Sequence, residues 1–461
     1  MSFLNSFQRW FKTFLPTPFS IALCLTFIAF LLAISLTKPN NLSAFHYSLK
    51  IIEYWENGLW NNALMVFAVQ MMLILVLGHI LALSKPIDKL IKNITSYCNT
   101  TSSSATIVCF FTLIVSFFNW GLGLIFGAIL ARKVAENSTK KDLNISYPIV
   151  GAAGYSGLMV WHGGISGSAP IKVAENGHIK ELMQTITSPE KLALLPDAIY
   201  FNETVFSSMN IVTSLLLLLL IPCFFYIIGK NKHSNHIVNT IPVNTKKPTP
   251  IGAEKIDNSR YFSLISGTII LSYAIYKAFI KPDYFSLSFI TPNYICLVLL
   301  GLCLALHENI LSFLKALDSA IGGASGILIQ FPLYFGIMGI MRESGLILMF
   351  SDFLISISNQ TTFPIFTFIS AGVVNIFVPS GGGQWAIQGP IIIESAQQLN
   401  IPLSKAIMSL VYGDQLTNML QPFWALPLLG ITGLKAKEIL PYTMLTMLIG
   451  MIIFITALLF F

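Results

Sequence analysis

Charged side chains are scarce in this sequence. Only 10% of the 461 residues are Asp, Glu, Lys or Arg, whereas 54% are hydrophobic. An ordinary soluble domain carries about 25% charged residues, so this chain has too few to cover the surface of a soluble protein. Its hydrophobic residues also form runs long enough to cross a bilayer, and these recur at 19–37, 63–83, 207–228 and 441–461. The composition therefore predicts a polytopic, all-α integral membrane protein.

Sequence patterns for metal sites, disulfide bonds and nucleic-acid binding are also missing. The six cysteines form no CxxC pair, and most lie in apolar segments, where a thiol behaves as a small hydrophobe. His79 has no second His, Cys or carboxylate at metal-ligand spacing. The net charge of +7 is better explained by positive cytoplasmic loops than by nucleic-acid binding, because the sequence contains no basic helix. We predict no resident cofactor, no metal and no nucleic-acid partner.

The first 18 residues have an amphipathic pattern. Aromatic residues recur at helical spacing, with Arg9 and Lys12 between them and Pro16 ending the run. The pattern predicts a helix that lies in the membrane interface, over residues 1–18. No small-residue cleavage site follows, so we expect the run at 19–37 to be a retained first span.

Loop charges divide the chain into two membrane halves. Lys and Arg gather at the N-terminus, in the loop after the second apolar run and in the polar stretch 230–260, which places all three in the cytoplasm. The more acidic loop at 171–206 is expected on the outer side. The polar stretch is rich in Asn, Ser, Thr and Pro, as is typical of a flexible linker. It separates a first membrane half, 19–229, from a second, 261–461.

Two apolar segments are predicted to enter the membrane and return on the same side. Residues at about 105–131 have positive loops at both ends, which a simple span would put on opposite sides. A re-entrant hairpin resolves this, because non-helical backbone is tolerated at membrane depth when protein covers it. Residues at about 364–390 are predicted to form the corresponding hairpin of the second half, entering from the other side. Nine spans accompany these hairpins.

The two halves share a spaced motif. Asn119 opens a Gly-rich turn 36 residues before Tyr155, and Asn375 opens another 37 residues before Tyr412. This spacing and the opposite orientation of the halves favour two inverted repeats with broken helices, the architecture of many secondary transporters. A chance match of glycine clusters is the alternative, since Gly is common in transmembrane helices.

Broken helices of this kind can bind an anion. Pro379 and the three glycines after Ser380 cannot continue a helix, and the helix that follows presents free N–H groups and a positive dipole end. The confident spans contain no Arg, which favours a small monoanion over a phosphate ester or a tricarboxylate. The residues expected to contact the substrate are Asn119, Trp120, Gly121, Asn375, Ser380, Gly381, Gly382, Gly383, Gln384, Asn418 and Gln421. Trp161, Trp385 and Trp424 are candidates to surround its alkyl part, although packing is the commoner role of such residues.

Asp414 is the ionisable residue best suited to a coupling-ion site. It lies in an apolar stretch, where a carboxylate is costly and is a functional candidate by default. A proton or a sodium ion could bind there. The alternative is a structural role, in which Asp414 neutralises a neighbour such as Lys405 or lies at the interface.

An intramembrane serine protease is a further alternative. Ser166 lies in a Gly-x-Ser-Gly string, but nucleophilic catalysis requires a base within hydrogen-bond reach. His162 is four residues away, and the glycines between them argue against a helix that would bring the two together. We therefore predict that the protein is not an enzyme.

Four stretches stand out as motifs: FNWG at 118–121, SGSAP at 166–170, VPSGGGQWAIQGP at 378–390 and QPFWALP at 421–427. In these motifs the sequence resembles the short-chain fatty acid transporter family of bacteria, over essentially its whole length. The resemblance implies uptake of acids such as butyrate or acetoacetate, on a scaffold similar to the wider ion-transporter superfamily. Gln384 stands where the family has a His, Asp414 where it has a Glu, and His162 lies in a Gly-rich turn. These departures leave the coupling ion open between H⁺ and Na⁺.

The expected function is secondary active transport of a short-chain monocarboxylate across a bacterial inner membrane, by alternating access and with ion coupling. The N-terminus is expected to be cytoplasmic. The expected partners are the small carboxylate and the lipid bilayer, and a homo-oligomer is left open. The alternative within transport is another small organic anion, such as a C4-dicarboxylate. A membrane sensor that carries no substrate is the alternative from another class.

Overall fold

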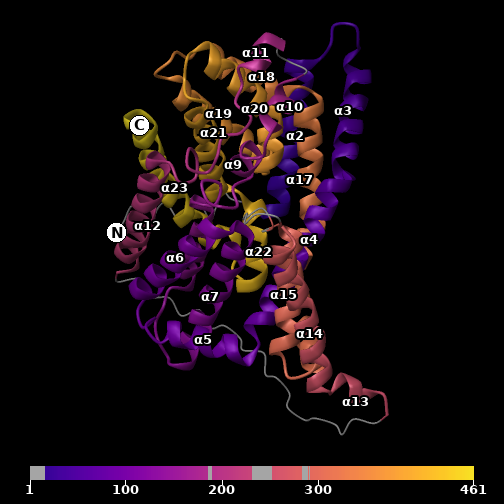
Figure 1. Ribbon diagram of the computed structural model, residues 1–461, viewed down its shortest axis with the longest axis vertical. Coiled ribbons are helices and arrows are strands. Elements are labelled where there is room, and N and C mark those ends of the chain that lie inside the picture. Colours follow the sequence, from indigo (N-terminus) through magenta and orange to yellow (C-terminus); the bar gives the residue numbers. More distant parts are fainter. Residues whose placement is uncertain (1–15, 185–188, 231–251, 283–288, 290) are drawn as a thin grey trace.

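The chain forms a bundle of helices (Figure 1). The computed structural model describes residues 16–184, 189–230, 252–282, 289 and 291–461, and these ranges contain no strand. Seven of the described helices are long and apolar enough to cross a membrane. The prediction of an all-α integral membrane protein is confirmed.

Two predicted segments fall largely outside the described residues. The structure does not describe the interfacial helix at 1–18 before residue 16, or the linker at 230–260 between 231 and 251. The described end of the linker contains a short helix, α13 (Glu254–Asp257).

Three predicted spans of the first half form helices close to their predicted bounds. They are α2 (Pro18–Thr37), α4 (Asn62–Ala82) and α12 (Ser208–Gly229). Each begins directly after a Thr, Asn or Ser whose side-chain oxygen accepts a hydrogen bond from the first turn. Polar capping residues at the ends of apolar runs therefore set where these helices start.

The sequence prediction misses one long helix, α3 (Ala44–Leu59). Three charged residues interrupt the apolar pattern by which spans are recognised. The helix packs along α17 (Ser325–Glu343), where Gly58 faces Gly339 and a Cβ on either glycine would overlap backbone atoms of the other helix. Small residues thus let two helix backbones approach closely, a common contact in membranes.

The first predicted hairpin is present and longer than expected. It consists of α6 (Thr101–Phe118) and α7 (Trp120–Lys140), which join at the single residue Asn119. Asn119 has extended backbone, and its Oδ1 accepts a hydrogen bond from the N–H of Leu122 (2.9 Å). One residue therefore ends the first arm and caps the second.

The second predicted hairpin is also present. Its arms are α19 (Phe363–Phe377) and α20 (Gly381–Gln398), and Ser380 Oγ caps α20 by accepting from the N–H of Gly383 (3.2 Å). In Figure 1 the first hairpin lies in the lower half of the molecule beside α5 (Lys85–Thr95), whereas α19 and α20 lie in the upper half. The hairpins thus come from opposite ends of the bundle. The inverted-repeat relation itself stays a prediction.

A span of the first half is broken just after Tyr155, the residue that ends the 36-residue spacing from Asn119. α8 (Tyr147–Tyr155) continues into a 3-10 turn, η1 (Ser156–Met159), and the chain is then non-helical until α9 (Ser168–Val173) begins. The intervening residues 160–167 include three glycines and are buried. We call residues 160–167 the first break.

The corresponding span of the second half is not broken at Tyr412 but several residues after it. α21 (Leu403–Thr417) runs through Tyr412 without interruption and ends in a 3-10 turn, η5 (Asn418–Leu420). The chain then enters α22 (Pro422–Thr432) at a proline, which has no N–H to offer the preceding turn. We call residues 418–421 the second break.

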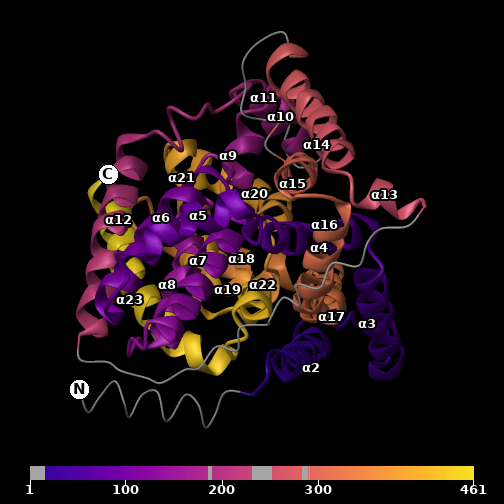
Figure 2. The ribbon, with the colours of Figure 1, turned by 90° about the horizontal axis from the view of Figure 1, so that it is seen from below.

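The view along the long axis of the molecule shows which helices are central and which are peripheral. Figure 2 shows α7, α8, α19 and α22 near the middle of the outline and α3, α13 and α14 at its rim. The helices not yet given are α10 (His178–Met183), α11 (Pro189–Ala193), α14 (Arg260–Ile275) with the π-helical turn η2 (Tyr276–Ile280), α15 (Pro292–Leu306), α16 (Ile310–Ala320), the 3-10 turn η4 (Ile321–Ala324), α18 (Leu346–Ser356) and α23 (Ala436–Phe460).

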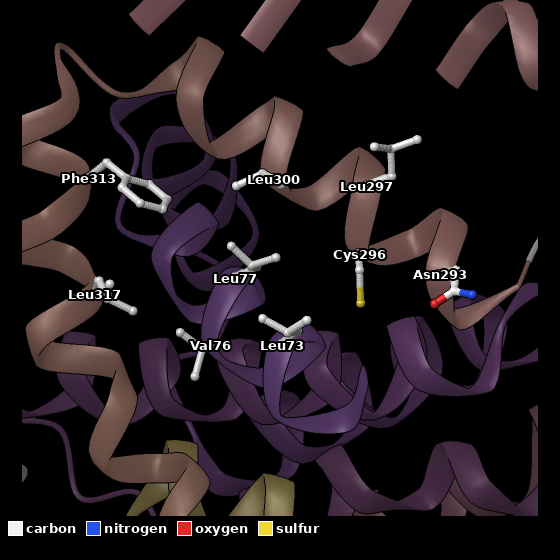
Figure 3. A pocket seen from close by; sticks show the side chains of 9 residues that line it. All are labelled: Leu73, Val76, Leu77, Asn293, Cys296, Leu297, Leu300, Phe313 and Leu317. Atoms are coloured by element: carbon white, nitrogen blue, oxygen red, sulfur yellow. The ribbon is translucent and has the colours of Figure 1, made fainter. Parts of the chain in front are cut away.

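An apolar crevice of about 380 Å³ lies between α4, α15 and α16 (Figure 3). Leu73 and Leu77 of α4, Leu300 of α15 and Leu317 of α16 are among its lining residues. None of the lining residues belongs to a hairpin or to a broken helix. The crevice is therefore separate from the candidate site.

Candidate functional site

The tip of the first hairpin rests on the first break. The N–H of Trp120 donates a hydrogen bond to Ser166 Oγ (3.0 Å). Further along the hairpin, Gly127 lies so close to Gly154 of α8 that a Cβ there would overlap the carbonyl oxygen of Gly154. The hairpin and the first broken helix are thus packed backbone to backbone.

The tip of the second hairpin rests on the same break. A Cβ on Gly381 would lie 2.8 Å from Cε1 of His162 and 2.9 Å from the ring of Trp161. Trp161 also contacts the first hairpin, since its ring centroid is 5.8 Å from that of Trp120. The two tips, which we expected to approach each other, therefore share Trp161 as a common neighbour.

Four predicted site residues form one buried hydrogen-bond network at the second break. Asn375 Nδ2 donates to the carbonyl of Asp414 (2.7 Å) and to Asn418 Oδ1 (2.8 Å), and Gln421 Nε2 donates to the carbonyl of Asn375. None of the four residues is more than 3% exposed. The structure therefore brings together polar residues of α19, α21 and the second break.

Long-range hydrogen bonds that the sequence did not indicate connect the two breaks. Tyr155 Oη donates to the carbonyl of Asn418 (2.8 Å), and Gln415 Oε1 accepts from the backbone N–H groups of His162 and Gly163 (both 3.0 Å). Backbone N–H or C=O groups of each break thus form hydrogen bonds with a side chain of the other broken helix. Buried backbone groups need such partners. More than 250 positions separate these partners, so no local pattern could have indicated them.

Asp414 lies beside His162. Oδ2 of Asp414 contacts Nδ1 of His162, and both side chains are at most 1% exposed. On the other edge of the ring, Nε2 of His162 accepts a hydrogen bond from the N–H of Ala169 (3.1 Å). The neighbour considered from the sequence was Lys405, whereas the observed partner of the carboxylate is His162.

The geometry does not favour the protease alternative. Both ring nitrogens of His162 are engaged, by Asp414 and by Ala169, so neither is placed as a base for Ser166. The hydroxyl of Ser166 accepts from the backbone of Trp120 instead. Ser166 therefore has a structural role, which is to hold the tip of the first hairpin.

Gln384 lies inside the second hairpin. Its Nε2 donates to the carbonyl of Ala371 on the other arm (2.8 Å) and to Gln388 Oε1 (2.7 Å). Gln388 in turn donates to Ser370 Oγ (3.1 Å). These amides join the two arms of the hairpin.

Three tryptophans form an aromatic cluster next to the breaks. The ring centroid of Trp424 is 5.1 Å from that of Trp120 and 6.4 Å from that of Trp161, and Phe67 of α4 packs against Trp120 (6.0 Å). The indole Nε1 atoms of Trp161 and Trp424 are buried and have no hydrogen-bond partner among the described residues. Buried N–H groups usually have partners, so this cluster offers two free donors beside an apolar wall.

Trp385, the fourth candidate, faces another element. Its Nε1 donates to Nε2 of His178 in α10 (3.1 Å), which lies in the predicted outer loop. Burial, with a smaller effect of the nearby Lys172 charge, lowers the pKa of His178, which favours the neutral ring that this hydrogen bond requires. Trp385 thus connects the second hairpin to the outer loop.

Two hairpins and two broken helices that meet at a buried polar centre define a multi-pass α-helical membrane protein of the transporter class. The chain belongs to the short-chain fatty acid transporter family. The model of this family, described as "Short chain fatty acid transporter", matches residues 3–461. The resemblance inferred from the motifs is confirmed. Membership of this family also agrees with the prediction that the protein is not an enzyme.

Relatives in two bacteria are similar over their whole length. A protein of Escherichia coli (strain K12) named "Putative short-chain fatty acid transporter" is 35% identical over 462 residues, covering 98% of each chain. A protein of the same name in Haemophilus influenzae is 35% identical over 469 residues, covering 99% of this chain and 100% of the relative.

Two solved transporter structures are more distant. The YdaH transporter of Alcanivorax borkumensis has a TM-score of 0.42 at 12% identity, covering 95% of this chain and 97% of the other. MtrF of Neisseria gonorrhoeae, whose structure is described for a class of antimetabolite efflux pumps, has a TM-score of 0.45 at 12% identity, covering 99% and 97%.

Proposed function

We propose that the protein takes up short-chain fatty acids, such as butyrate and acetoacetate, across a bacterial inner membrane. The family and the names of the two relatives support this class of substrate. The observation that carries the proposal is the aromatic cluster of Trp120, Trp161 and Trp424. In this cluster the indole N–H groups of Trp161 and Trp424 have no hydrogen-bond partner among the residues that the structure describes. A short alkyl chain suits the aromatic wall, and a carboxylate accepts hydrogen bonds from such donors.

The polar groups at the breaks favour a substrate with one carboxylate. Asn418 Nδ2 is a third buried donor without a hydrogen-bond partner in the described part of the chain. The capped helix ends at Asn119 and Ser380 add positive dipole ends. Tight binding of a second carboxylate would normally require Arg or Lys. A C4-dicarboxylate is therefore the less suitable occupant.

Transport in this proposal uses alternating access. The two hairpins and the two breaks meet around the substrate, so a movement of one group of helices against the other would expose the site first on one side and then on the other. Asp414 supplies the coupling-ion site, because it is a buried carboxylate next to the break that contacts both hairpin tips.

Exchange of radiolabelled butyrate by the purified protein in proteoliposomes tests the proposal. We expect saturable exchange that excess unlabelled butyrate inhibits more strongly than excess succinate. Trp424→Phe keeps an aromatic ring but removes one free donor, so we expect the half-saturation concentration to rise about tenfold or more, the usual effect of losing a hydrogen bond to a charged group.

Trp55→Phe is the matched control for this substitution. Trp55 also has a buried indole N–H without a hydrogen-bond partner among described residues, but it packs against Gly336 of α17, away from the breaks. Its replacement should leave the half-saturation concentration unchanged. Equal effects of the two substitutions would argue against the aromatic cluster as the site, and a wild-type protein without flux would point to the sensor alternative.

A further inference from the structure

His162 and Asp414 form a buried pair of ionisable side chains between the two broken helices. Asp414 belongs to α21, and His162 lies in the first break. Nδ1 of His162 contacts Oδ2 of Asp414, and neither side chain is more than 1% exposed. A charge at such depth costs free energy unless a partner compensates it. The protonation state of the pair therefore affects the free energy of the buried site.

The backbone determines where the ring hydrogen lies. The N–H of Ala169 donates to Nε2 of His162 (3.1 Å), so Nε2 acts as an acceptor and carries no hydrogen. In a neutral imidazole the single ring hydrogen is then on Nδ1, which faces Asp414. A neutral His162 therefore donates to Oδ2 of Asp414, so the pair carries one negative charge when the carboxyl group is ionised and none when Oδ1 carries a proton.

The immediate neighbours do not compensate this charge. Oδ1 of Asp414 is buried and has no hydrogen-bond partner among the residues that the structure describes. Asn375 of α19 donates to the backbone carbonyl of Asp414, and Gln415 accepts from the backbone of His162. The α20 backbone at Gly381 contacts the ring. All of these groups are uncharged.

Titratable side chains on the surrounding elements have other partners or positions. Tyr155 of α8 donates to the carbonyl of Asn418, and Tyr412 of α21 donates to Oδ1 of Asn210 on α12. Lys172 of α9 pairs with Glu175. On α8, Tyr147 donates to the carbonyl of Thr432. The other charged side chains and tyrosines of α20, α21 and α23 are Glu394 on α20, Lys405 in the first turn of α21, and Lys437, Glu438 and Tyr442 near the start of α23. On the first hairpin, Cys109 of α6 contacts Ser156, and the charged residues of α7 lie in its second half, from Arg132 onward.

We infer that His162 and Asp414 together bind the coupling proton, and that Oδ1 of Asp414 is the atom that receives it. One proton on Oδ1 gives a neutral pair in which the Nδ1 hydrogen of His162 still faces Oδ2. A neutral pair loses less solvation energy than a charged one when buried helices rearrange. The inference rests on the proposed function, because a coupling ion presupposes a transported solute.

The position of the pair suits such coupling. His162 stacks on Trp161 of the aromatic cluster, with ring centroids 4.5 Å apart, and contacts the second hairpin at Gly381. Protonation of Asp414 would therefore change the charge beside the proposed substrate and at a hairpin tip at the same time. An anionic substrate is expected to bind more readily once the carboxylate is neutral.

A sodium ion is the competing occupant. It would need several oxygen ligands, and Asn375 Oδ1 and Gln421 Oε1 are buried oxygens with no partner in the described ranges. However, Oδ2 of Asp414 faces a ring N–H, whose positive end repels a cation. One free carboxylate oxygen is sufficient for a proton, and this favours the proton over the metal ion.

Acetoacetate transport in proteoliposomes tests the inference. Acetoacetate is a stronger acid than butyrate and so enters vesicles less readily as the neutral acid, and protein-free vesicles measure this passive entry. We expect an inward proton gradient, and not a sodium gradient of the same size, to drive accumulation by the wild type. Asp414→Asn, which mimics the protonated carboxyl, should lose accumulation, and whatever exchange it catalyses should no longer depend on pH. His162→Gln should shift that pH dependence.

His46→Gln and Asp318→Asn are matched controls, because both residues are exposed and distant in sequence from the breaks. They should behave as the wild type does. Accumulation driven by sodium alone, or an Asp414→Asn variant with the wild-type pH profile, would overturn the inference while leaving the proposed function intact. A wild type that exchanges neither acetoacetate nor butyrate would overturn both. The gradient comparison uses only the wild type, so it decides the coupling ion even if a variant fails to fold.

Discussion

Single buried side chains connect the two helix breaks. Tyr155 donates its hydroxyl hydrogen to the carbonyl groups of Asn418 (2.8 Å) and Gln421 (3.1 Å), which lie where α21 gives way to α22. A buried carbonyl that loses its donor costs about 1–3 kcal/mol. The hydroxyl therefore stabilises the break in addition to the packing of the ring.

Replacing Tyr155 by Phe should lower the free energy of unfolding by about 1–3 kcal/mol, because two buried carbonyls lose a donor. Thermal unfolding in detergent, followed by loss of the monodisperse protein, measures the change. Tyr334→Phe is the control, since the buried Tyr334 hydroxyl has no hydrogen-bond partner among the described residues. It should be neutral or slightly stabilising. A Tyr155→Phe variant as stable as Tyr334→Phe would contradict this role.

The sequence indicated part of the polar centre at the residue scale. Asp414 was predicted because a carboxylate is costly in an apolar stretch. Asn375, Asn418 and Gln421 were predicted because the spans lack Arg, which leaves amide side chains to hold an anion. All four lie in one network. The partner of Asp414 was not predicted, because His162 is 252 positions away. The sequence indicated His162 only as a candidate base for Ser166 and as a departure from a family pattern.

Glycine contacts determine how closely the elements approach. Gly127 of α7 faces Gly154 of α8, and Gly58 of α3 faces Gly339 of α17. At each of these positions a Cβ would overlap backbone atoms, which cannot move as a flexible side chain can. These glycines are thus required for packing between helices rather than for backbone flexibility.

Substituting Gly127 with Ala should separate the first hairpin from α8 and destabilise the protein by about 1–3 kcal/mol, the usual cost of overpacking. Gly322→Ala is the control, because its Cβ would meet no atom within 4 Å, and its effect should stay within about 0.5 kcal/mol. Both are measured by thermal unfolding in detergent. Equal stability of the two variants would show that the hairpin tolerates a wider separation.

The arrangement of the whole molecule agrees with the loop charges. α5 and the described end of the linker, α13, lie at the lower end in Figure 1, whereas α10 and α11 lie at the upper end. The sequence places the first pair in the cytoplasm and the second outside. The molecule therefore has the two ends that the charge pattern requires, and the assignment of each end to a side of the membrane is testable.

Single cysteines at Tyr97 and Leu194, which are 72% and 80% exposed, test the orientation. In a background with the six native cysteines replaced by Ser, a membrane-impermeant maleimide added to intact spheroplasts should label Leu194→Cys. Tyr97→Cys should react only after the membrane is permeabilised. The reverse pattern would place the N-terminus outside.

The sequence alone determined the membrane class, the two hairpins and the polar residues of the second break, because apolar runs, loop charges and out-of-place polar side chains are local properties. Even there, charged residues concealed α3, and the break in the second half lies after Tyr412. Only the tertiary structure decided that both hairpin tips contact Trp161 and that His162 faces Asp414. Those contacts join residues that are far apart in the chain, and they depend on which helices pack together.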